Sequence, residues 1–426
     1  MDATELATAL QAAVSGLLGP VTIDGLTRLS GGASRETWAF DAVATDAGGR
    51  SELVLRRDPP SRPSEPGAMS REARVIGAAA AAGLAVPYVL ASTDEPGLWG
   101  SAGLLMRRVA GETIARRILR DEAYRPARAV LTAQLGEFAA GLHALAVPDG
   151  LRTADPLPEL RSTLGDLGQS SPVFERALTA LEASPPPARP QVTVHGDLRL
   201  GNLIVGPDGL RAVIDWELVH AGNPAEDLGW LCVKAWRFGV EPPVAGLGTR
   251  EELLAAYRAA GGADISLDEL RWWELLGTLR WGVICMTQAQ AHLSGALRSV
   301  ELAAIGRRVC EQEWDLLLLL EPDAAAEAAA RRPRPAGGPA PEPAPYGRPT
   351  ASELLDAVRG FLSDQVMPAT SGQLAFHARV AANVIGIVAR ELELGQVPPE
   401  SGLADQVAAR LAVANPRYFD PLPTQP

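Results

Sequence analysis

Residues 195–217 constrain this chain more than any other segment, because polar groups stand at both ends of a predicted hairpin. The segment begins with HGDLRLGN, ends with DWE, and holds between them two apolar runs separated by GPDG. Apolar runs around such a turn are typical of a β-hairpin with a four-residue loop. A hairpin returns the chain beside its start, so we expect Asn202 and Asp215 to lie close together, with Asp197 near both.

These side chains supply what phosphoryl transfer requires. A carboxylate must receive the proton of the acceptor hydroxyl, and oxygen ligands must hold magnesium against the ATP phosphates. Asp197 offers the carboxylate, and Asn202 and Asp215 offer the oxygen ligands. The alternative is a polar loop whose side chains merely cap turns, and the hairpin between the two groups argues against it.

The segment resembles the catalytic loop of the aminoglycoside phosphotransferase family, which shares the protein-kinase fold. The kinase pattern H-R-D-x-x-x-x-N followed by D-F-G has its counterpart here in H-G-D-x-x-x-x-N followed by D-W-E. The resemblance implies that Asp197 is the catalytic base and that Arg199 lies near the transferred phosphate. It also implies that Asn202 and Asp215 bind magnesium, and that Asp227 is a buried aspartate that braces the loop.

The N-terminal block is expected to hold the nucleotide. Its sequence LSGGAS, at 29–34, lies between two predicted strands and could present backbone N–H groups to phosphates. A Gly-Gly hairpin turn explains these residues equally well. The resemblance to the family's glycine-containing phosphate loop assigns Gly31, Gly32 and Ser34 to the nucleotide.

The strand LVLR, at 53–56, resembles the VAIK strand of kinases. Strand alternation puts Val54 and Arg56 on one face, so Val54 would cover the adenine and Arg56 would reach the phosphates. Arginine keeps the charge of the family's lysine but changes its reach and geometry, and the only lysine, Lys234, lies far from this strand. Glu72, on the next predicted helix, is expected to pair with Arg56; an exposed helix glutamate is the alternative.

Several further residues receive weaker assignments. Met106 and Arg107 resemble the segment that joins the two lobes, where backbone groups meet the adenine edge. Glu217 is as good a candidate for assisting the metal through water as for a purely structural role. We expect His143 and His195 to be structural, and His377 and Arg379 to lie on a helix surface. The tryptophans at 272, 273 and 281 are expected to pack in the core, with the lining of a substrate pocket as the alternative.

The chain divides into four predicted parts. Residues 1–110 form a β-rich nucleotide-binding lobe, and 111–322 form a helical lobe with the catalytic loop and substrate cleft. A Pro/Ala-rich linker follows over 323–349, and a helical domain over 350–426 opens on a capping-box pattern. The predicted fold class is α+β: a protein-kinase-like bilobal fold plus a small all-α C-terminal domain. Because so small a domain is marginally stable alone, we expect it to mediate oligomerisation or partner docking.

Composition excludes some partners. The net charge of −12 argues against broad nucleic-acid binding and against docking on anionic lipid. No run approaches the roughly 18–20 uninterrupted apolar residues of a membrane span, and the first residues lack the basic flank and apolar core of a signal peptide. Three widely separated cysteines predict a reduced, cytoplasmic protein.

The resemblance covers about residues 20–320 and predicts an ATP- and Mg²⁺-dependent phosphotransferase that acts on a hydroxyl group of a small molecule. The sequence HGDLRLGN resembles the corresponding loop of the family branch attached to acyl-CoA dehydrogenases. The resemblance suggests a hydroxyacyl-CoA or related metabolite as acceptor. The C-terminal unit resembles small uncharacterised helical domains associated with that branch. Two alternatives stay open. One is a kinase for aminoglycosides or other cationic alcohols, which would be favoured if acidic residues crowd the helical cleft; the other is a non-catalytic nucleotide-binding scaffold.

Overall fold

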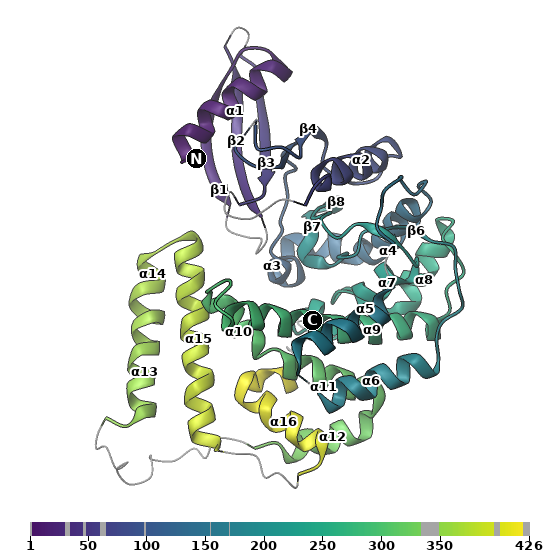
Figure 1. Ribbon diagram of the computed structural model, residues 1–426, viewed down its shortest axis with the longest axis vertical. Helices are drawn as coiled ribbons and strands as arrows, with labels where there is room; N and C mark the ends of the chain where they lie inside the picture. Colours follow the sequence, from purple (N-terminus) through teal and green to yellow (C-terminus); the bar gives the residue numbers. More distant parts are fainter. Residues whose placement is uncertain are drawn as a thin grey trace.

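The computed structural model describes residues 2–29, 35–45, 48–59, 65–97, 99–153, 155–169, 171–333, 349–395 and 401–420. A strand-rich N-terminal lobe lies above a helical lobe, and helices α13 to α15 stand beside the helical lobe (Figure 1). The predicted α+β, kinase-like bilobal fold is confirmed. The boundary between the lobes near residue 110 stays a proposal.

The N-terminal lobe is an antiparallel sheet with helices on it. Its strand order is β1-β2-β3-β5-β4. The strands are β1 (Val21–Leu29), β2 (Glu36–Ala44), β3 (Arg50–Arg57), β4 (Val89–Thr93) and β5 (Gly103–Arg107). Helix α1 (Ala3–Leu18) begins at a capping box formed by Asp2 and Glu5 and buries its apolar stripe against the sheet. Helix α2 (Ala68–Ala81) follows β3 in the sequence.

Strand β3 alternates as predicted. Leu53 and Leu55 are completely buried in the core beneath α1. Val54 and Arg56 are half-buried on the opposite face, because successive side chains of a strand point to opposite sides of the sheet. Arg56 on that face contacts Asp215 in the second lobe, so the face that carries Val54 and Arg56 is the one turned toward residues 195–217.

The second lobe is mainly helical. Its helices are α3 (Ala115–Arg120), α4 (Arg125–His143), α5 (Pro156–Leu167), α6 (Pro172–Ala183), α7 (Ala225–Cys232), α8 (Arg250–Ala259), α9 (Leu267–Leu293), α10 (Val300–Gly306) and α11 (Val309–Leu320). Two small two-stranded sheets hold residues 195–217 in place. They are β6 (Val192–Val194) with β9 (His220–Gly222), which flank the segment, and β7 (Leu203–Gly206) with β8 (Gly209–Val213), which lie within it. The predicted hairpin is therefore present, with its turn at GPDG.

The stretch predicted as a linker begins as a helix. Helix α12 (Pro322–Arg331) has proline in its first turn, and Ala325 and Ala328 are completely buried. Alanine is the strongest helix former, so an alanine-rich run directly after proline continues the helical lobe instead of ending it. Most of the remaining linker, 334–348, lies outside the described residues.

The C-terminal helices fall into two groups. Helix α16 (Leu403–Ala414) buries Val407, Ala408 and Leu411 in the core of the helical lobe, beside α11 and α12. Helices α13 (Ala351–Phe361) and α15 (Gly372–Leu394) pack on each other, joined by a π-helical turn (Leu362–Val366) and the short α14 (Met367–Ala369). A single independent three-helix unit is therefore not what forms; a separate C-terminal domain stays a proposal for α13 to α15.

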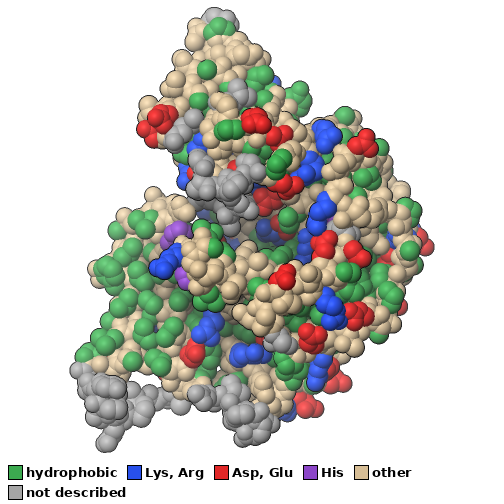
Figure 2. Space-filling view, in the orientation of Figure 1, with side chains coloured by type: hydrophobic (Ala, Val, Ile, Leu, Met, Phe, Trp, Pro, Cys, Tyr) green, Lys and Arg blue, Asp and Glu red, His purple; other side chains and the backbone are tan. Residues whose placement is uncertain are grey.

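The pair α13 and α15 exposes many apolar side chains. Leu354, Val358 and Phe361, at helical spacing on α13, are all exposed, and Figure 2 shows apolar side chains gathering over this part of the surface. By length and composition alone α15 could cross a membrane. A core helix of a soluble protein passes the same test, so the finding assigns no location.

Candidate active site

The carboxylate of Asp197 is held by three side chains at the end of β6. Trp230 donates its Nε1–H to Oδ1 at 2.8 Å, and Arg199 donates its Nε–H to both oxygens at 2.9 and 3.1 Å. Asn202 donates from Nδ2 to Oδ2 at 2.6 Å and to the Asp197 carbonyl at 2.9 Å. Such contacts fix the orientation of a carboxylate before any substrate arrives.

Asp227 braces the loop from beneath, as predicted. Its completely buried carboxylate accepts the backbone N–H groups of His195 at 2.8 Å and Gly196 at 3.0 Å, and lies 3.3 Å from His143 Nε2. Gly196 has φ of +79°, and a Cβ there would stand 2.6 Å from the Leu218 carbonyl oxygen, so only glycine fits. Burial raises the pKa of Asp227, but the hydrogen bond and charge of His143 outweigh it and leave the pKa lowered.

His195 is a structural residue in this loop. Its Nδ1 accepts the backbone N–H of Asp197 at 3.1 Å, so Nε2 carries the proton that is donated to the Ile214 carbonyl at 3.1 Å. Burial lowers the pKa of His195, which favours this neutral form. The ring also packs against Trp216, with the two centroids 4.6 Å apart.

The hairpin brings Asp215 beside Asn202, as predicted. The backbone N–H of Ile214 donates to the Asn202 carbonyl at 2.9 Å, which places the next residue, Asp215, at the loop. Asp215 has φ of +70°, a left-handed conformation that is uncommon outside glycine and clusters at functional sites. Burial raises the pKa of Asp215, but the neighbouring Arg56 guanidinium outweighs it and leaves the pKa lowered.

The expected ion pair between Arg56 and Glu72 does not form among the described side chains. Arg56 contacts Asp215 and lies 3.4 Å from Glu217. Glu72 instead binds Arg35 at 2.6 Å. Arg35 also binds Asp58 at 3.0 Å, so it reaches the buried Glu72 from the start of β2, while the longer side chain of arginine at position 56 extends to Asp215.

The segment between the lobes has part of its backbone already engaged. Arg107 donates its N–H to the Tyr88 carbonyl, and Arg108 donates its N–H to the Glu52 carbonyl, both at 2.9 Å. Met106 pairs with Val54 across β3 and β5, so these two predicted adenine neighbours lie together. Any contact of Arg107 with adenine would come from its carbonyl or side chain. The predicted phosphate-loop residues Gly31, Gly32 and Ser34 lie outside the described residues.

Comparison with known protein families assigns this chain to one of them. The model described as "Phosphotransferase enzyme family" matches residues 25–273, more than half of the chain. The chain belongs to the phosphotransferase enzyme family. A second model, a domain of unknown function (DUF6285), matches residues 368–402, within the predicted helical domain of unknown function.

Curated relatives of this phosphotransferase are acyl-CoA dehydrogenase family members. Member 11 from Rattus norvegicus is 26% identical over 274 residues, which cover 58% of this chain and 34% of the rat protein. Member 10 from Mus musculus is 29% identical over 196 residues, which cover 43% of this chain and 18% of the mouse protein. The chain thus spans about a third or less of these relatives, and the resemblance to their branch is confirmed.

Solved structures share the fold of this phosphotransferase. A Ralstonia eutropha protein described as an aminoglycoside phosphotransferase has a TM-score of 0.55 at 20% identity, covering 74% of this chain and 98% of its own. A choline/ethanolamine kinase family protein from Mesorhizobium loti has a TM-score of 0.50 at 21% identity, covering 75% of this chain and 95% of its own. At these identities the likeness concerns the fold alone.

The donor set of the phosphotransferase fits magnesium. Asn202 directs its amide nitrogen to Asp197, which turns its amide oxygen away from that carboxylate, and Arg56 contacts Oδ1 of Asp215. Magnesium is commonly bound by one or two such oxygen groups, with phosphates and water completing the octahedron. Within the described residues no group of three or more His, Cys, Asp or Glu side chains could hold a metal ion, so a magnesium ion here would need oxygen ligands from phosphate or water as well.

Sequence reasoning missed Arg35 and Trp230. Arg35 directly follows the predicted glycine loop and carries three acidic partners, Asp58, Glu72 and Glu217. Trp230 lies three residues beyond Asp227 on α7, so one helical turn carries both the brace and a donor to Asp197. A polar or aromatic residue one turn after the bracing aspartate was the available signal.

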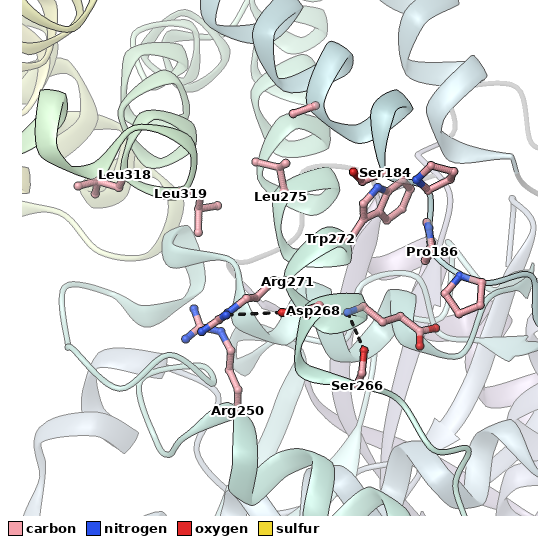
Figure 3. Close-up of a pocket in the computed structure, with 14 residues that line it drawn as sticks. Ser184, Pro186, Arg250, Ser266, Asp268, Arg271, Trp272, Leu275, Leu318 and Leu319 are labelled. Atoms are coloured by element: carbon pink, nitrogen blue, oxygen red, sulfur yellow. Dashed lines mark hydrogen bonds and ion pairs between the residues drawn. The ribbon is translucent and has the colours of Figure 1, made fainter.

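A cavity of about 690 Å³ lies away from this site. Figure 3 shows it between the start of α9 and the end of α11, with Arg250, Arg271, Trp272 and Leu318 among the residues around it. Trp272 donates its Nε1–H to the Leu181 carbonyl at 3.0 Å, in keeping with its predicted structural role. None of the described residues lining the cavity belongs to 195–217, so we do not include it in the candidate active site.

Proposed function

We propose that this phosphotransferase moves the terminal phosphoryl group of ATP to a hydroxyl group of a small molecule, with magnesium. Asp197 receives the proton of the acceptor hydroxyl, and Arg199 lies beside it to meet the transferred phosphate. Asn202 and Asp215 would hold magnesium, which neutralises phosphate charge. Arg56 neutralises phosphate charge from the other lobe.

The nucleotide binds on the face of the sheet that carries Arg56. Val54 and Met106 pair across β3 and β5 and offer an apolar surface to the adenine, with Arg107 at its edge. Gly31, Gly32 and Ser34 are assigned to the phosphates. Glu72 supports this side through Arg35 instead of binding Arg56 directly.

One observation carries the proposal. A carboxylate with three fixed donors stands beside an amide and a second carboxylate that the hairpin returns to it. This is the constellation of one base and hard oxygen ligands that phosphoryl transfer needs. Asp215 is also one of three described non-glycine residues at positive φ, a conformation that recurs at functional sites.

For the acceptor we propose a hydroxyacyl-CoA or related metabolite. The curated relatives are named as acyl-CoA dehydrogenase family members. The loop sequence HGDLRLGN also resembles that of the kinase branch attached to acyl-CoA dehydrogenases. An aminoglycoside or other cationic alcohol is the competing acceptor, suggested by the name of the structural relative from Ralstonia eutropha.

The test is phosphate transfer from ATP and magnesium across a panel of hydroxyacyl-CoAs, free hydroxy acids, aminoglycosides and choline. Radiolabelled product and released ADP are both measured, because ADP release alone also reports ATP hydrolysis. Transfer to one class that disappears in Asp197→Asn supports the proposal. Transfer that persists in Asp197→Asn would rule out Asp197 as the base.

A nucleotide-binding scaffold without catalysis is the second candidate. It is favoured by arginine at position 56, which contacts Asp215 directly where the kinase pattern has lysine. A scaffold would bind ATP with magnesium and transfer nothing to any acceptor, and its binding would be the same in Asp197→Asn. The cytoplasmic location and the docking role of the C-terminal helices stay predictions.

A further inference from the structure

Three arginine side chains lie over a stack of three indoles. Lys234 comes from the same short helix as Trp236, the middle indole, and lies over the ring of Tyr418 at 4.3 Å. The rings of Trp230 and Trp236 are 5.3 Å apart and those of Trp236 and Trp281 are 4.9 Å apart, centroid to centroid. The basic side chains, which we call the basic wall, are Arg199, Lys234, Arg280 and Arg308.

The arginines of the basic wall each cover one ring of the stack. Arg280 lies 5.3 Å from the centroid of Trp230, Arg199 lies 4.9 Å from that of Trp236, and Arg308 lies 5.7 Å from that of Trp281. Rings with cations on their faces hold those cations in place. The basic wall is therefore built on a fixed support rather than on free surface side chains.

The basic wall begins at the proposed catalytic base. Trp230, at one end of the stack, donates to Asp197 Oδ1 at 2.8 Å, and Arg199 binds the same carboxylate. From there the stack leads through Trp236 to Trp281 and Arg308. An acceptor whose hydroxyl reaches Asp197 can lay the rest of its structure along these side chains.

Each member of the basic wall has an acidic partner that lies deeper than itself. The side chains of Arg280 and Glu226 are 19% and 6% exposed, those of Arg308 and Glu311 are 37% and 6%, and those of Lys234 and Asp315 are 32% and 2%. Arg199 and Asp197 follow the same order at 26% and 15%.

Along the stack the more exposed partner of each pair is therefore the cation, although each pair is neutral overall. The carboxylates of Asp215 and Glu217, toward the other lobe, are exposed to a similar degree, 25% and 26%. Glu226 is also bound by His220 at 3.0 Å, so the Arg280 pair carries surplus positive charge when that histidine is protonated. An accessible cation with its counter-ion buried behind it attracts an anion and repels a second cation.

We propose that the acceptor is an alcohol that carries carboxylate or phosphate groups, and that the basic wall recognises them. This inference rests on the proposed phosphotransferase function and selects between its two acceptor classes. Cationic aminoglycosides fit poorly beside these side chains, whereas the phosphates of a coenzyme A thioester or the carboxylate of a hydroxy acid fit well.

The test measures binding apart from catalysis, by calorimetric titration at low and moderate salt. The probes are 3-hydroxybutyryl-CoA, its uncharged N-acetylcysteamine thioester, free 3-hydroxybutyrate and kanamycin. We expect the CoA thioester to bind at least about tenfold more tightly than the uncharged thioester, with the difference shrinking as salt rises. Equal binding of the uncharged and CoA thioesters, or tighter binding of kanamycin, overturns the inference.

Two neighbouring arginines supply a matched pair of variants. Arg308 belongs to the basic wall, while Arg307 binds Glu391 of α15 in an exposed pair at 2.6 Å. Arg308→Gln is expected to weaken binding of the CoA thioester about three- to tenfold and leave the uncharged thioester unchanged, whereas Arg307→Gln changes neither. An equal loss in both variants contradicts the assignment.

Lys234→Gln serves as a second variant if Arg308→Gln does not fold, because Lys234 is partly exposed and its loss is expected to weaken binding of the CoA thioester.

Tight binding of free 3-hydroxybutyrate would place recognition at the carboxylate, and binding of the CoA thioester alone would place it at the phosphates. A charge preference without any phosphate transfer would refute only the kinase proposal. Asp197-dependent transfer to kanamycin would refute only this inference.

Discussion

The catalytic loop and the ion-pair cluster across from it hold their carboxylates in different ways. Asp197 and Asp227 are bound by groups of the helical lobe alone, from the loop itself, α4 and α7. The ion-pair cluster joins the two lobes. Glu72 and its partner Arg35 belong to the N-terminal lobe, whereas Asp215, beyond β8, is bound by Arg56 of β3.

We infer that the difference separates the two functions proposed for these residues, general-base catalysis and nucleotide binding. A base fixed within one lobe keeps its geometry whatever the other lobe does, as general-base catalysis requires. Charges that bridge the lobes can exchange partners when phosphates enter, so they are suited to nucleotide binding. Changes in the loop should therefore affect the chemical step or the fold, and changes in the bridging cluster should affect nucleotide affinity.

The largest effect is expected from Asp197→Asn. The amide keeps the size of the side chain but cannot receive the hydroxyl proton, so kcat should fall about 1,000-fold, within the range for loss of a general base. ATP affinity, measured by calorimetry, should stay within about twofold, because the substitution leaves Arg56 and Asp215 in place. A parallel loss of ATP affinity would break the comparison, since it would tie the loop to the bridging cluster.

Asp227→Asn should lower stability instead. It removes a buried charge that accepts two backbone N–H groups, which is expected to cost about 2–3 kcal/mol of unfolding free energy. Because the folded pKa is lowered, the contribution of Asp227 is complete above the unfolded pKa near 4 and is lost as pH falls through the folded value.

Urea unfolding at several pH values checks this expectation. The gap between wild type and Asp227→Asn should be constant from about pH 6 to pH 7 and should close in acid below about pH 4. Asp208→Asn is a suitable control, because Asp208 is exposed in the hairpin turn and pairs with Arg211. A gap that widened in acid would show that the pKa of Asp227 is raised and that the bracing account is wrong.

The catalytic loop and the ion-pair cluster also differ in how many of their contacts the sequence predicts. The loop and its hairpin are local: HGDLRLGN, the turn and DWE occupy one segment, so the contacts of Asn202 with Asp197 and of Ile214 with Asn202 follow from short-range geometry. The bracing role of Asp227 followed from its place in the family pattern. Arg35 was missed, because its pairing with Glu72 joins residues 37 positions apart and nothing in the local sequence prefers Arg35 to Arg56.

The C-terminal region shows a similar limit. The capping box at Thr350 and Glu353 is present at the predicted helix start, because a cap is a local feature. Helix α16 packs on α11 and α12 and also contacts α15, and which apolar faces meet over such sequence distances is not a local feature. The predicted linker includes residues 323–331 because a proline-rich stretch follows them, although their alanines favour the helix that forms.

Arg56→Gln tests the bridging cluster. Losing a cation that faces the phosphates should raise the ATP Kd about tenfold, because about 1.4 kcal/mol corresponds to a factor of ten. The melting temperature should fall as well, because the Arg56 side chain is only 13% exposed and its loss leaves the Asp215 carboxylate without that cation. Arg56→Lys keeps the charge and restores the residue of the kinase pattern, so its ATP affinity should stay close to wild type. Unchanged affinity in Arg56→Gln would remove this residue from the nucleotide site.

The smallest effect is expected from His220→Gln, beside the loop but outside both carboxylate groups. His220 Nδ1 lies 2.9 Å from the Leu218 carbonyl and Nε2 lies 3.0 Å from Glu226; two acceptors require both nitrogens to be protonated. Burial lowers the pKa of His220, but Glu226 outweighs it and leaves the pKa raised. The contribution of His220 to the unfolding free energy, about 1 kcal/mol, is therefore complete below the unfolded pKa near 6.5. It is lost as pH rises through the pKa of the folded state.

Urea unfolding at pH 6 and pH 9 should show a lower unfolding free energy for His220→Gln than for wild type at pH 6 and little difference at pH 9, the reverse of the trend for Asp227→Asn. A deficit that grew with pH would mean that His220 is neutral, and that the surplus positive charge beside Arg280 is absent.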